Sequence, residues 1–195
     1  MEPINLFVAI NLFVTITANF SAAKKDLRSK LSSVVNRPKT YLQKLPPNVS
    51  AIILLIIIAG IFNLGTFSNE VKERFFEIRI ISLIVFIIFS WLQIFSYKSL
   101  GEFYSQEIVI LKNHTLKTNS YYKLIRHPQY VSQILSDLGA VLAVMSYVAI
   151  PLVILIELPL FYLRAKFEEN ILQKHFKDKY VEYKNKSGFF IPFVG

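Results

Sequence analysis

The sequence contains no cysteine. This absence excludes disulfide bonds, thiolate metal sites and any mechanism that uses a cysteine nucleophile. Histidine is also scarce, since the 195 residues include only His114, His127 and His175. None of the three has the paired spacing that is typical of a zinc site. We therefore expect no metal centre in this protein.

Glycine is scarce as well, and the six glycines form no G-x-G-x-x-G turn. Soluble enzymes that bind a nucleotide-like cofactor commonly place its phosphates or ribose against such a turn. A Rossmann-type cofactor site is therefore not supported. Any cofactor of this kind must be bound by a site of different construction.

Apolar residues are abundant, and they are concentrated in long runs. The chain is 53% hydrophobic, with a mean hydropathy of +0.44. Residues 4–23, 51–68 and 78–97 are single apolar runs, and 129–163 is a longer stretch that is broken near 147–151. A bilayer core about 30 Å thick is crossed by about 20 helical residues. The runs predict an all-α integral membrane protein with five transmembrane helices.

The first apolar run has a second interpretation, as a signal peptide. Ser21-Ala22-Ala23 resembles a cleavage site for small residues. However, Glu2 stands where a signal peptide carries basic residues, and the run is long for the apolar part of one. We therefore predict a first membrane helix and keep the signal peptide as the alternative.

The formal net charge of +9 is clustered beside the apolar runs. The connector at 24–49, the loop at 98–126 and the tail from Lys166 onward are basic, whereas 69–79 is balanced. Lysine and arginine concentrate on the cytoplasmic side of membrane proteins. We therefore predict an outside N-terminus and a cytoplasmic C-terminus. Attraction to anionic lipid explains the basic charge more simply than nucleic acid does, so no nucleic-acid partner is expected.

One polar cluster, Arg126-His127-Pro128-Gln129-Tyr130, stands where the basic loop meets the fourth predicted span. Proline is well tolerated at the first position of a helix. The free N–H groups and positive dipole end of such a helix suit an anionic group. The alternative is a basic flank with tyrosine as an interfacial anchor.

A second cluster lies at the end of the fifth predicted span. Arg164 and Glu168 are four residues apart and share a helical face. Arginine there can hold a carboxylate, and the glutamate can face a cation. A simple ion pair at the membrane boundary is the alternative interpretation.

Two acidic residues, Asp137 and Glu157, fall inside predicted spans. Charged groups at membrane depth are costly and usually turn inward to partners. A polar contact between the fourth and fifth helices and a functional role are both consistent with their positions.

The tail beyond Arg164 predicts an amphipathic helix at the cytoplasmic surface, continuous with the fifth span. Its apolar and aromatic residues recur near the helical period, with lysines between them: Phe167, Ile171, Leu172, Phe176, Tyr180 and Tyr183. Within the fifth span, Pro159 removes one backbone donor and is expected to kink the helix.

Taken together, the last 90 or so residues resemble the isoprenylcysteine carboxyl methyltransferase family. The match consists of His114 to Lys117, Tyr122, Arg126 to Val131, Arg164, Glu168-Glu169, and a tail from Phe176 to Pro192. The resemblance implies a compact, microbial-type member with five spans. Residues 1–100 would hold the first three membrane helices and the basic connector, and 101–195 would form the catalytic region.

The resemblance also implies that S-adenosylmethionine binds on the cytoplasmic side. Carried over by position, the cofactor contacts would be His114, Thr115, Leu116, Lys117, Tyr122, His127, Pro128, Gln129, Tyr130 and Glu168. Arg164 would bind the substrate and, with Glu168, form the catalytic pair. The chain departs from the family pattern at Lys117, where a small aliphatic residue is usual, and at Asn119-Ser120, where glycine is favoured.

The implied reaction is methyl ester formation on the carboxylate of a lipophilic, prenylcysteine-like substrate. A carboxylate of pKa about 3.3–3.7 is ionised at neutral pH, so no general base is needed. Catalysis would then depend on positioning and on exclusion of water. The alternatives are a methyltransferase for phospholipid or another amphiphile, a sterol-type membrane reductase, and a non-catalytic membrane protein.

Overall fold

The computed structural model describes residues 2–29, 34–112 and 114–195, so 30–33 of the basic connector, with Lys30, lie outside the described residues. The chain is mostly helical, as predicted. Its α-helices are α1 (Pro3–Ser29), α2 (Leu45–Ile61), α3 (Asn69–Arg74), α4 (Phe76–Leu100), α5 (Pro128–Ala143), α6 (Ala149–Leu152), α7 (Leu158–Phe176) and α8 (Asp178–Lys184). A π-helical turn, η5 (Val153–Glu157), joins α6 to α7. Two short strands, β1 (Val34–Asn36) and β2 (Ile110–Leu111), pair antiparallel and are a small departure from an all-α fold.

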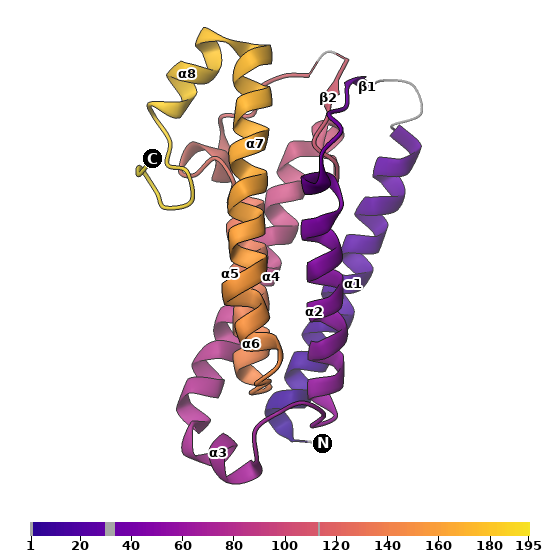
Figure 1. The fold of residues 1–195 in the computed structure, drawn as a ribbon, viewed down its shortest axis with the longest axis vertical. Helices are drawn as coiled ribbons and strands as arrows, with labels where there is room; N and C mark the ends of the chain where they lie inside the picture. Colours follow the sequence, from indigo (N-terminus) through magenta and orange to yellow (C-terminus); the bar gives the residue numbers. More distant parts are fainter. Residues whose placement is uncertain (1, 30–33, 113) are drawn as a thin grey trace.

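The long helices α1, α2, α4, α5 and α7 lie side by side (Figure 1). Helix α3 and the N-terminus lie at one end of this bundle, and the strands, α8 and the C-terminus lie at the other. Two helical segments, Tyr41–Ile61 and Phe76–Leu100, are long and apolar enough to cross a membrane. The count of five spans and their orientation stay predictions.

Helices α4 and α5 pack closely because Gly139 has no side chain. A Cβ atom at this position would lie 2.6 Å from the backbone nitrogen of Phe86 and 2.8 Å from the carbonyl oxygen of Ser82. Small residues at such contacts allow the backbones of membrane helices to approach each other. The close approach fixes α5, whose first turn belongs to the functional site.

The buried core draws residues from α1, α2, α4, α5 and the following turns. Its fully buried members include Val8, Ile53, Val141 and Val144. Helix α1 contributes Ile4, Val8 and Leu12 to this core. Many large apolar side chains point outward instead, as in Phe13, which is 70% exposed. Outward apolar faces are expected where a helix meets lipid.

A buried polar network closes the α3 end of the bundle. Arg79 donates from Nε to the carbonyl of Ala143 at 2.9 Å and from Nη2 to Glu2 at 2.6 Å. Lys72 donates to Asn63 Oδ1 at 2.5 Å. These two basic residues of the 69–79 segment therefore connect Glu2, which precedes α1, to the turn at Asn63 and to the end of α5.

The tail differs from the single continuous helix that its periodicity predicts. Helix α7 ends at Phe176, and α8 begins again after Lys177, whose φ is +50°. The chain turns here, and Tyr180 and Tyr183 become buried. The apolar face of the tail thus points inward, toward a cavity between α8 and the 100–130 loop. At Pro159 the expected disturbance takes the form of the π-helical turn that precedes α7.

Candidate functional site

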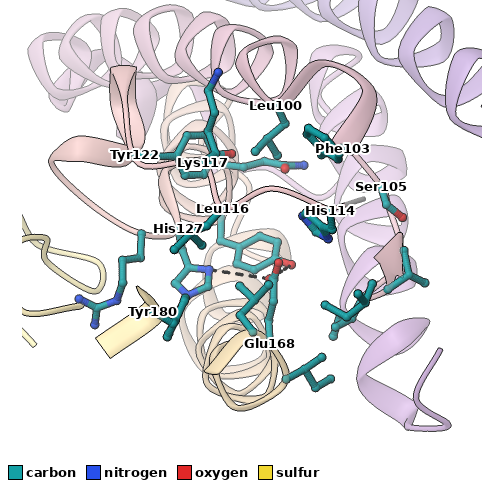
Figure 2. Close-up of a pocket in the computed structure, with 18 of the residues that line it drawn as sticks. Leu100, Phe103, Ser105, His114, Leu116, Lys117, Tyr122, His127, Glu168 and Tyr180 are labelled. Atoms are coloured by element: carbon teal, nitrogen blue, oxygen red, sulfur yellow. Dashed lines mark hydrogen bonds and ion pairs between the residues drawn. The ribbon is translucent and has the colours of Figure 1, made fainter. Parts of the chain in front are cut away.

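A cavity, which we call the loop cavity, lies where the 100–130 loop meets α7 and α8 (Figure 2). Most of the predicted cofactor residues line it: His114, Leu116, Lys117, Tyr122, His127, Gln129, Tyr130 and Glu168. Thr115 is exposed and Pro128 is buried, and neither is among the residues that line the cavity. The structure thus brings together eight of the ten predicted contacts.

The first turn of α5 forms part of this wall. Pro128 occupies the first turn after the N-cap residue His127, as the sequence predicts. The backbone N–H groups of Gln129 and Tyr130 have no acceptor within the helix, because the helical ladder begins with the bond from Val131 to His127. The N–H groups of this turn and the positive end of the helix dipole therefore lie at a wall of the cavity, an arrangement that suits an anionic group.

Tyr130 connects the two residues predicted to form the catalytic pair. Its hydroxyl donates to Glu168 Oε2 at 2.8 Å and accepts from Arg164 Nε at 3.0 Å. The expected contact between Arg164 and Glu168 therefore runs through a tyrosine from another helix. His127 Nδ1 is also 3.8 Å from Glu168, whose side chain keeps 30% of its surface exposed. The carboxylate thus remains open to the cavity.

His114 offers an unpaired nitrogen to the same cavity. Its ring stacks on Phe103, with centroids 5.3 Å apart and planes 5° apart, and Phe176 approaches it edge-on. The Nδ1 atom is buried and has no hydrogen-bond partner among the described residues. Burial, followed by the nearby charge of His175, lowers the pKa of His114. The neutral ring can therefore donate or accept one hydrogen bond to a bound molecule.

Arg126 does not act as the free anion-binding group that its place in the sequence suggested. Its guanidinium pairs with Glu169, and it also donates to the carbonyls of Ser187 and, at 2.9 Å, Gly195. Burial alone would raise the pKa of Glu169, but His127 and Arg126 lower it to about 2. This buried pair ties the C-terminal tail to the start of α5 and lies beside His127.

Two residues of the tail, for which periodicity alone predicted a position at the cytoplasmic surface, complete the wall. Tyr180 and Tyr183 line the loop cavity. Tyr183 donates to the backbone carbonyl of Tyr122 at 2.6 Å, which joins α8 to the loop. The aromatic periodicity was the available signal, but it cannot distinguish a face toward lipid from a face toward a cavity.

A second cavity, which we call the bundle cavity, is lined by α1, α2, α4, α5 and α7. Its wall is formed by Leu12, Thr15, Ile16, Asn19, Pro47, Ser50, Ala51, Leu54, Ser90, Gln93, Tyr104, Ser105, Gln106, Gln129, Tyr130, Gln133, Ser136, Asp137, Phe161 and Arg164. Ser105, Gln129 and Tyr130 line both cavities. The two spaces therefore meet at the first turn of α5.

Arg164 lines the bundle cavity and is held rigidly. Its Nη1 donates to the carbonyls of Leu42 at 2.8 Å and Gln43 at 3.0 Å, and its Nη2 donates to Gln106. With the bond to Tyr130, four of the five N–H groups of an arginine are engaged. Arg164 thus connects two loops to the first turn of α5 and is a fixed positive charge beside the shared wall.

Comparisons with known proteins agree with this arrangement. The isoprenylcysteine carboxyl methyltransferase (ICMT) family matches residues 80–174. The Protein-S-isoprenylcysteine O-methyltransferase of Saccharomyces cerevisiae is 26% identical over 97% of this chain and 80% of its own length. The protein of the same name from Tribolium castaneum is 30% identical over 82 residues, which are 42% of this chain and 29% of that protein.

A solved structure is similar over the whole fold. The eukaryotic intramembrane Ras methyltransferase ICMT superposes with a TM-score of 0.67 and 20% identity, covering 100% of this chain and 69% of that one. Sequence and fold point to the same group of proteins. The resemblance predicted from the last 90 residues is confirmed, and the family match, the two methyltransferases and the fold together support an enzyme of the isoprenylcysteine carboxyl methyltransferase type.

Proposed function

We propose that this enzyme transfers a methyl group from S-adenosylmethionine to the carboxylate of a lipophilic, prenylcysteine-like substrate and forms a methyl ester. The observation that carries the proposal is the shared wall of the two cavities. Gln129 and Tyr130 line both, so a methyl donor in the loop cavity and an acceptor in the bundle cavity would meet at the first turn of α5. Names of the similar enzymes supply the reaction type.

The donor groups of the loop cavity fit S-adenosylmethionine, which supplies an activated methyl group when bound. Glu168 offers a carboxylate to a cationic amino or sulfonium group, and the first turn of α5 offers N–H groups to a carboxylate. The unpaired Nδ1 of His114 offers one further hydrogen bond. Leu116 and Leu172 provide apolar surface for the adenosine.

The acceptor carboxylate would lie in the bundle cavity, beside Arg164. The guanidinium is fixed by Leu42, Gln43 and Tyr130, so its charge is already in place before the substrate arrives. A carboxylate needs no deprotonation at neutral pH, and the site accordingly needs no general base. The work of these residues is to hold two reactants in line and to keep water out.

The competing hypothesis of a phospholipid or amphiphile methyltransferase differs in one testable respect. An amine acceptor must lose a proton before it attacks, whereas a carboxylate does not. The fixed cation at Arg164 favours an anionic acceptor. The similarity to named methyltransferases likewise favours methyl transfer over the reductase and the non-catalytic hypotheses.

The experiment is a transfer assay in detergent with radiolabelled S-adenosylmethionine and N-acetylated farnesylcysteine. We expect label in a base-labile ester, and we expect Arg164→Lys to lower the rate at least tenfold because lysine cannot keep four fixed hydrogen bonds. Asn170→Ala, at an exposed position of α7, is the matched control. Label that enters phosphatidylethanolamine and not the farnesylcysteine carboxylate would overturn the proposal.

A further inference from the structure

The chain after α8 forms a closed loop at residues 188–195, which we call the tail loop. It runs back from α8 toward the helix bundle (Figure 1). Phe189 N–H donates to the carbonyl of Val194 at 2.7 Å, and Val194 N–H donates to the carbonyl of Ile191 at 3.1 Å. These bonds give the loop a defined inner side, toward the protein, and a defined outer side.

The inner side of the tail loop is fixed to the functional site. The Gly188 carbonyl accepts from Arg126 N–H at 2.8 Å, and Gly188 N–H donates to the carbonyl of Leu124 at 3.0 Å. The ring of Phe189, which is buried, approaches His127 edge-on, with centroids 5.2 Å apart. Because His127 lines the loop cavity, the tail loop supports one wall of that cavity from behind.

The outer side of the tail loop is apolar and exposed. The exposed fractions of Ile191, Phe193 and Val194 are 62%, 73% and 58%. They are similar to that of Phe13, which points outward from α1. Phe193 also has a φ of +61°, a conformation that costs a bulky residue free energy. An exposed cluster of large apolar side chains marks a surface that contacts another molecule or a membrane.

The neighbouring part of α7 indicates which of these the surface meets. The exposed positions of α7 are apolar or aromatic as far as Leu163, and they are polar from Lys166 onward. Phe189 packs at this change, because its ring lies 5.4 Å from that of Tyr162 and 4.7 Å from Lys166 Nζ. Tyrosine is enriched where lipid meets water, and lysine there extends its ammonium group toward the headgroups. The tail loop therefore lies at the level of the membrane boundary.

Basic side chains adjoin the apolar surface. Lys166 is exposed on α7, Lys123 is exposed beside the turn that binds Gly188, and Lys186 is exposed just before the loop. Anionic headgroups of the cytoplasmic leaflet attract such basic groups. An apolar surface with a basic rim is the arrangement typical of segments that lie in the membrane interface.

We propose that the tail loop inserts Ile191, Phe193 and Val194 into the cytoplasmic leaflet of the membrane. The inference goes beyond the methyl transfer proposed above and rests on the predicted membrane position of the helix bundle. Helix α8, which was predicted to lie on the membrane surface, turns its aromatic residues inward, and the loop that follows it makes the lipid contact instead. Insertion holds Phe189 against His127 and so braces the wall of the loop cavity.

The test uses single-cysteine variants, which the cysteine-free sequence allows. Phe193→Cys and Ile191→Cys each carry a nitroxide spin label, in protein placed one copy per nanodisc of phosphatidylcholine and phosphatidylglycerol. Collisions of the label with oxygen, which concentrates in lipid, and with a water-soluble nickel chelate are measured by electron paramagnetic resonance. Ile84→Cys, exposed on α4, is the lipid control, and Glu182→Cys, exposed on α8, is the water control.

We expect the ratio of oxygen to nickel collisions at both loop positions to be several-fold higher than at Glu182. A ratio equal to that at Glu182 would show that the loop lies in water and would overturn the inference. Few collisions with either reagent would show that protein covers the loop, which also overturns it. Two label positions keep the test decisive if one variant misfolds.

The controls separate this inference from the topology on which it rests. A lipid-like ratio at Ile84 with a water-like ratio in the tail loop removes only the insertion of the loop. A water-like ratio at Ile84 contradicts the membrane position of the bundle and the insertion together. Methyl transfer is measured independently, by the assay with labelled S-adenosylmethionine, so its failure is distinguishable from either result.

Discussion

The Tyr130 hydroxyl accepts a hydrogen bond from Arg164 at 3.0 Å and donates one to Glu168 at 2.8 Å. It therefore holds a cation of the bundle cavity and an anion of the loop cavity in fixed relation. The tyrosine was predicted as a cofactor contact, but this bridging position was not. Nothing in a single sequence states that a residue of α5 will stand between two residues of α7.

Tyr130→Phe removes this bridge while keeping the ring. Hydrogen bonds to charged groups contribute about 1.5–3 kcal/mol, so we expect kcat to fall by roughly 10- to 150-fold. Steady-state kinetics of the purified variant would measure the change. Tyr121→Phe, in the neighbouring turn η4 (Ser120–Lys123), is the control and should retain full activity. An unchanged kcat for Tyr130→Phe would show that the bridge is not used in catalysis.

We expect the stability of the folded protein to depend on pH through Glu169. Its pKa is lowered from 4.5 to about 2 in the folded state, so its stabilisation is present above the unfolded value and is lost as the pH falls from about 4.5 to 2. The shift corresponds to about 3 kcal/mol at most. Thermal unfolding in detergent at pH 7, 4 and 3 measures this loss.

Glu169→Gln should lower the Tm at pH 7, because Arg126 would then be buried without its counter-charge, a loss of about 3–5 kcal/mol. It should also reduce the fall in Tm below pH 4.5. Glu182→Gln, at an exposed position of α8, serves as the control. A Tm at pH 7 that Glu169→Gln leaves unaltered would contradict the role of this ion pair.

At the scale of the elements, the contact between α4 and α5 depends on Gly139. In Gly139→Ala, the new Cβ would meet backbone atoms of Phe86 and Ser82, which cannot rotate away. We expect a loss of about 1–3 kcal/mol in unfolding free energy. Thermal or denaturant unfolding in detergent would measure it.

Gly60→Ala is a matched control for this prediction. Its Cβ would also be crowded, at 2.9 Å, but by a side-chain methyl of Val144 that can move. Alanine also gains helix propensity over glycine. We expect Gly60→Ala to be clearly less destabilising than Gly139→Ala. Equal losses would mean that backbone crowding does not set the cost.

Hydrophobicity predicted the long helices more closely than it predicted their ends. The run at 78–97 corresponds to Phe76–Leu100, but the run at 51–68 contains a helix that stops at Ile61. Residues beyond it enter a turn in which Asn63 and Gly65 have positive φ. Apolar residues can lie in such a turn, so composition alone does not reveal the helix end.

The π-helical turn was also outside the reach of sequence reasoning. Pro159 indicates that the helix is disturbed in the fifth predicted span, but it does not indicate which form the disturbance takes. In the structure the turn at Val153–Glu157 places Glu157 in the interior, where its carboxyl group accepts a hydrogen bond from Ser50 at 2.5 Å. The four-residue repeat of Gln129, Gln133 and Asp137 was the visible signal for a polar cavity, and its meaning depended on which helices surround it.

At the scale of the whole molecule, the basic segments gather at one end. The strands, the 100–130 loop and α8 lie opposite α3 and the N-terminus (Figure 1). This separation agrees with the charge pattern from which the topology was predicted. The loop cavity lies at this basic end, between the 100–130 loop, α7 and α8.

The lack of native cysteine allows a direct test of topology. Single cysteines at Glu70 and Lys186, both exposed, would be labelled in intact cells and in inverted vesicles with an impermeant maleimide. We expect Glu70→Cys to react from outside and Lys186→Cys only from the cytoplasmic side. Labelling of both cysteines from the same side would contradict the predicted topology, in which an odd number of membrane crossings separates Glu70 from Lys186.

The partners of charged residues were the main part of the site that the sequence left undetermined. Eight of the ten predicted cofactor residues line one cavity, and all of them except Glu168 lie within residues 114–130 of the sequence. By contrast, Arg126 pairs with Glu169, 43 residues away, and Arg164 binds carbonyls more than 100 residues earlier. Such long-range pairing is a property of the packed bundle and leaves no local pattern.

We propose that the loop cavity binds S-adenosylmethionine through Glu168. The most direct measurement is isothermal calorimetry of S-adenosylmethionine with the detergent-purified protein and with Glu168→Ala. We predict binding to the wild type at one molecule per chain, and at least tenfold weaker binding to a variant that keeps the wild-type Tm. Absence of binding to well-folded wild-type protein would contradict the account.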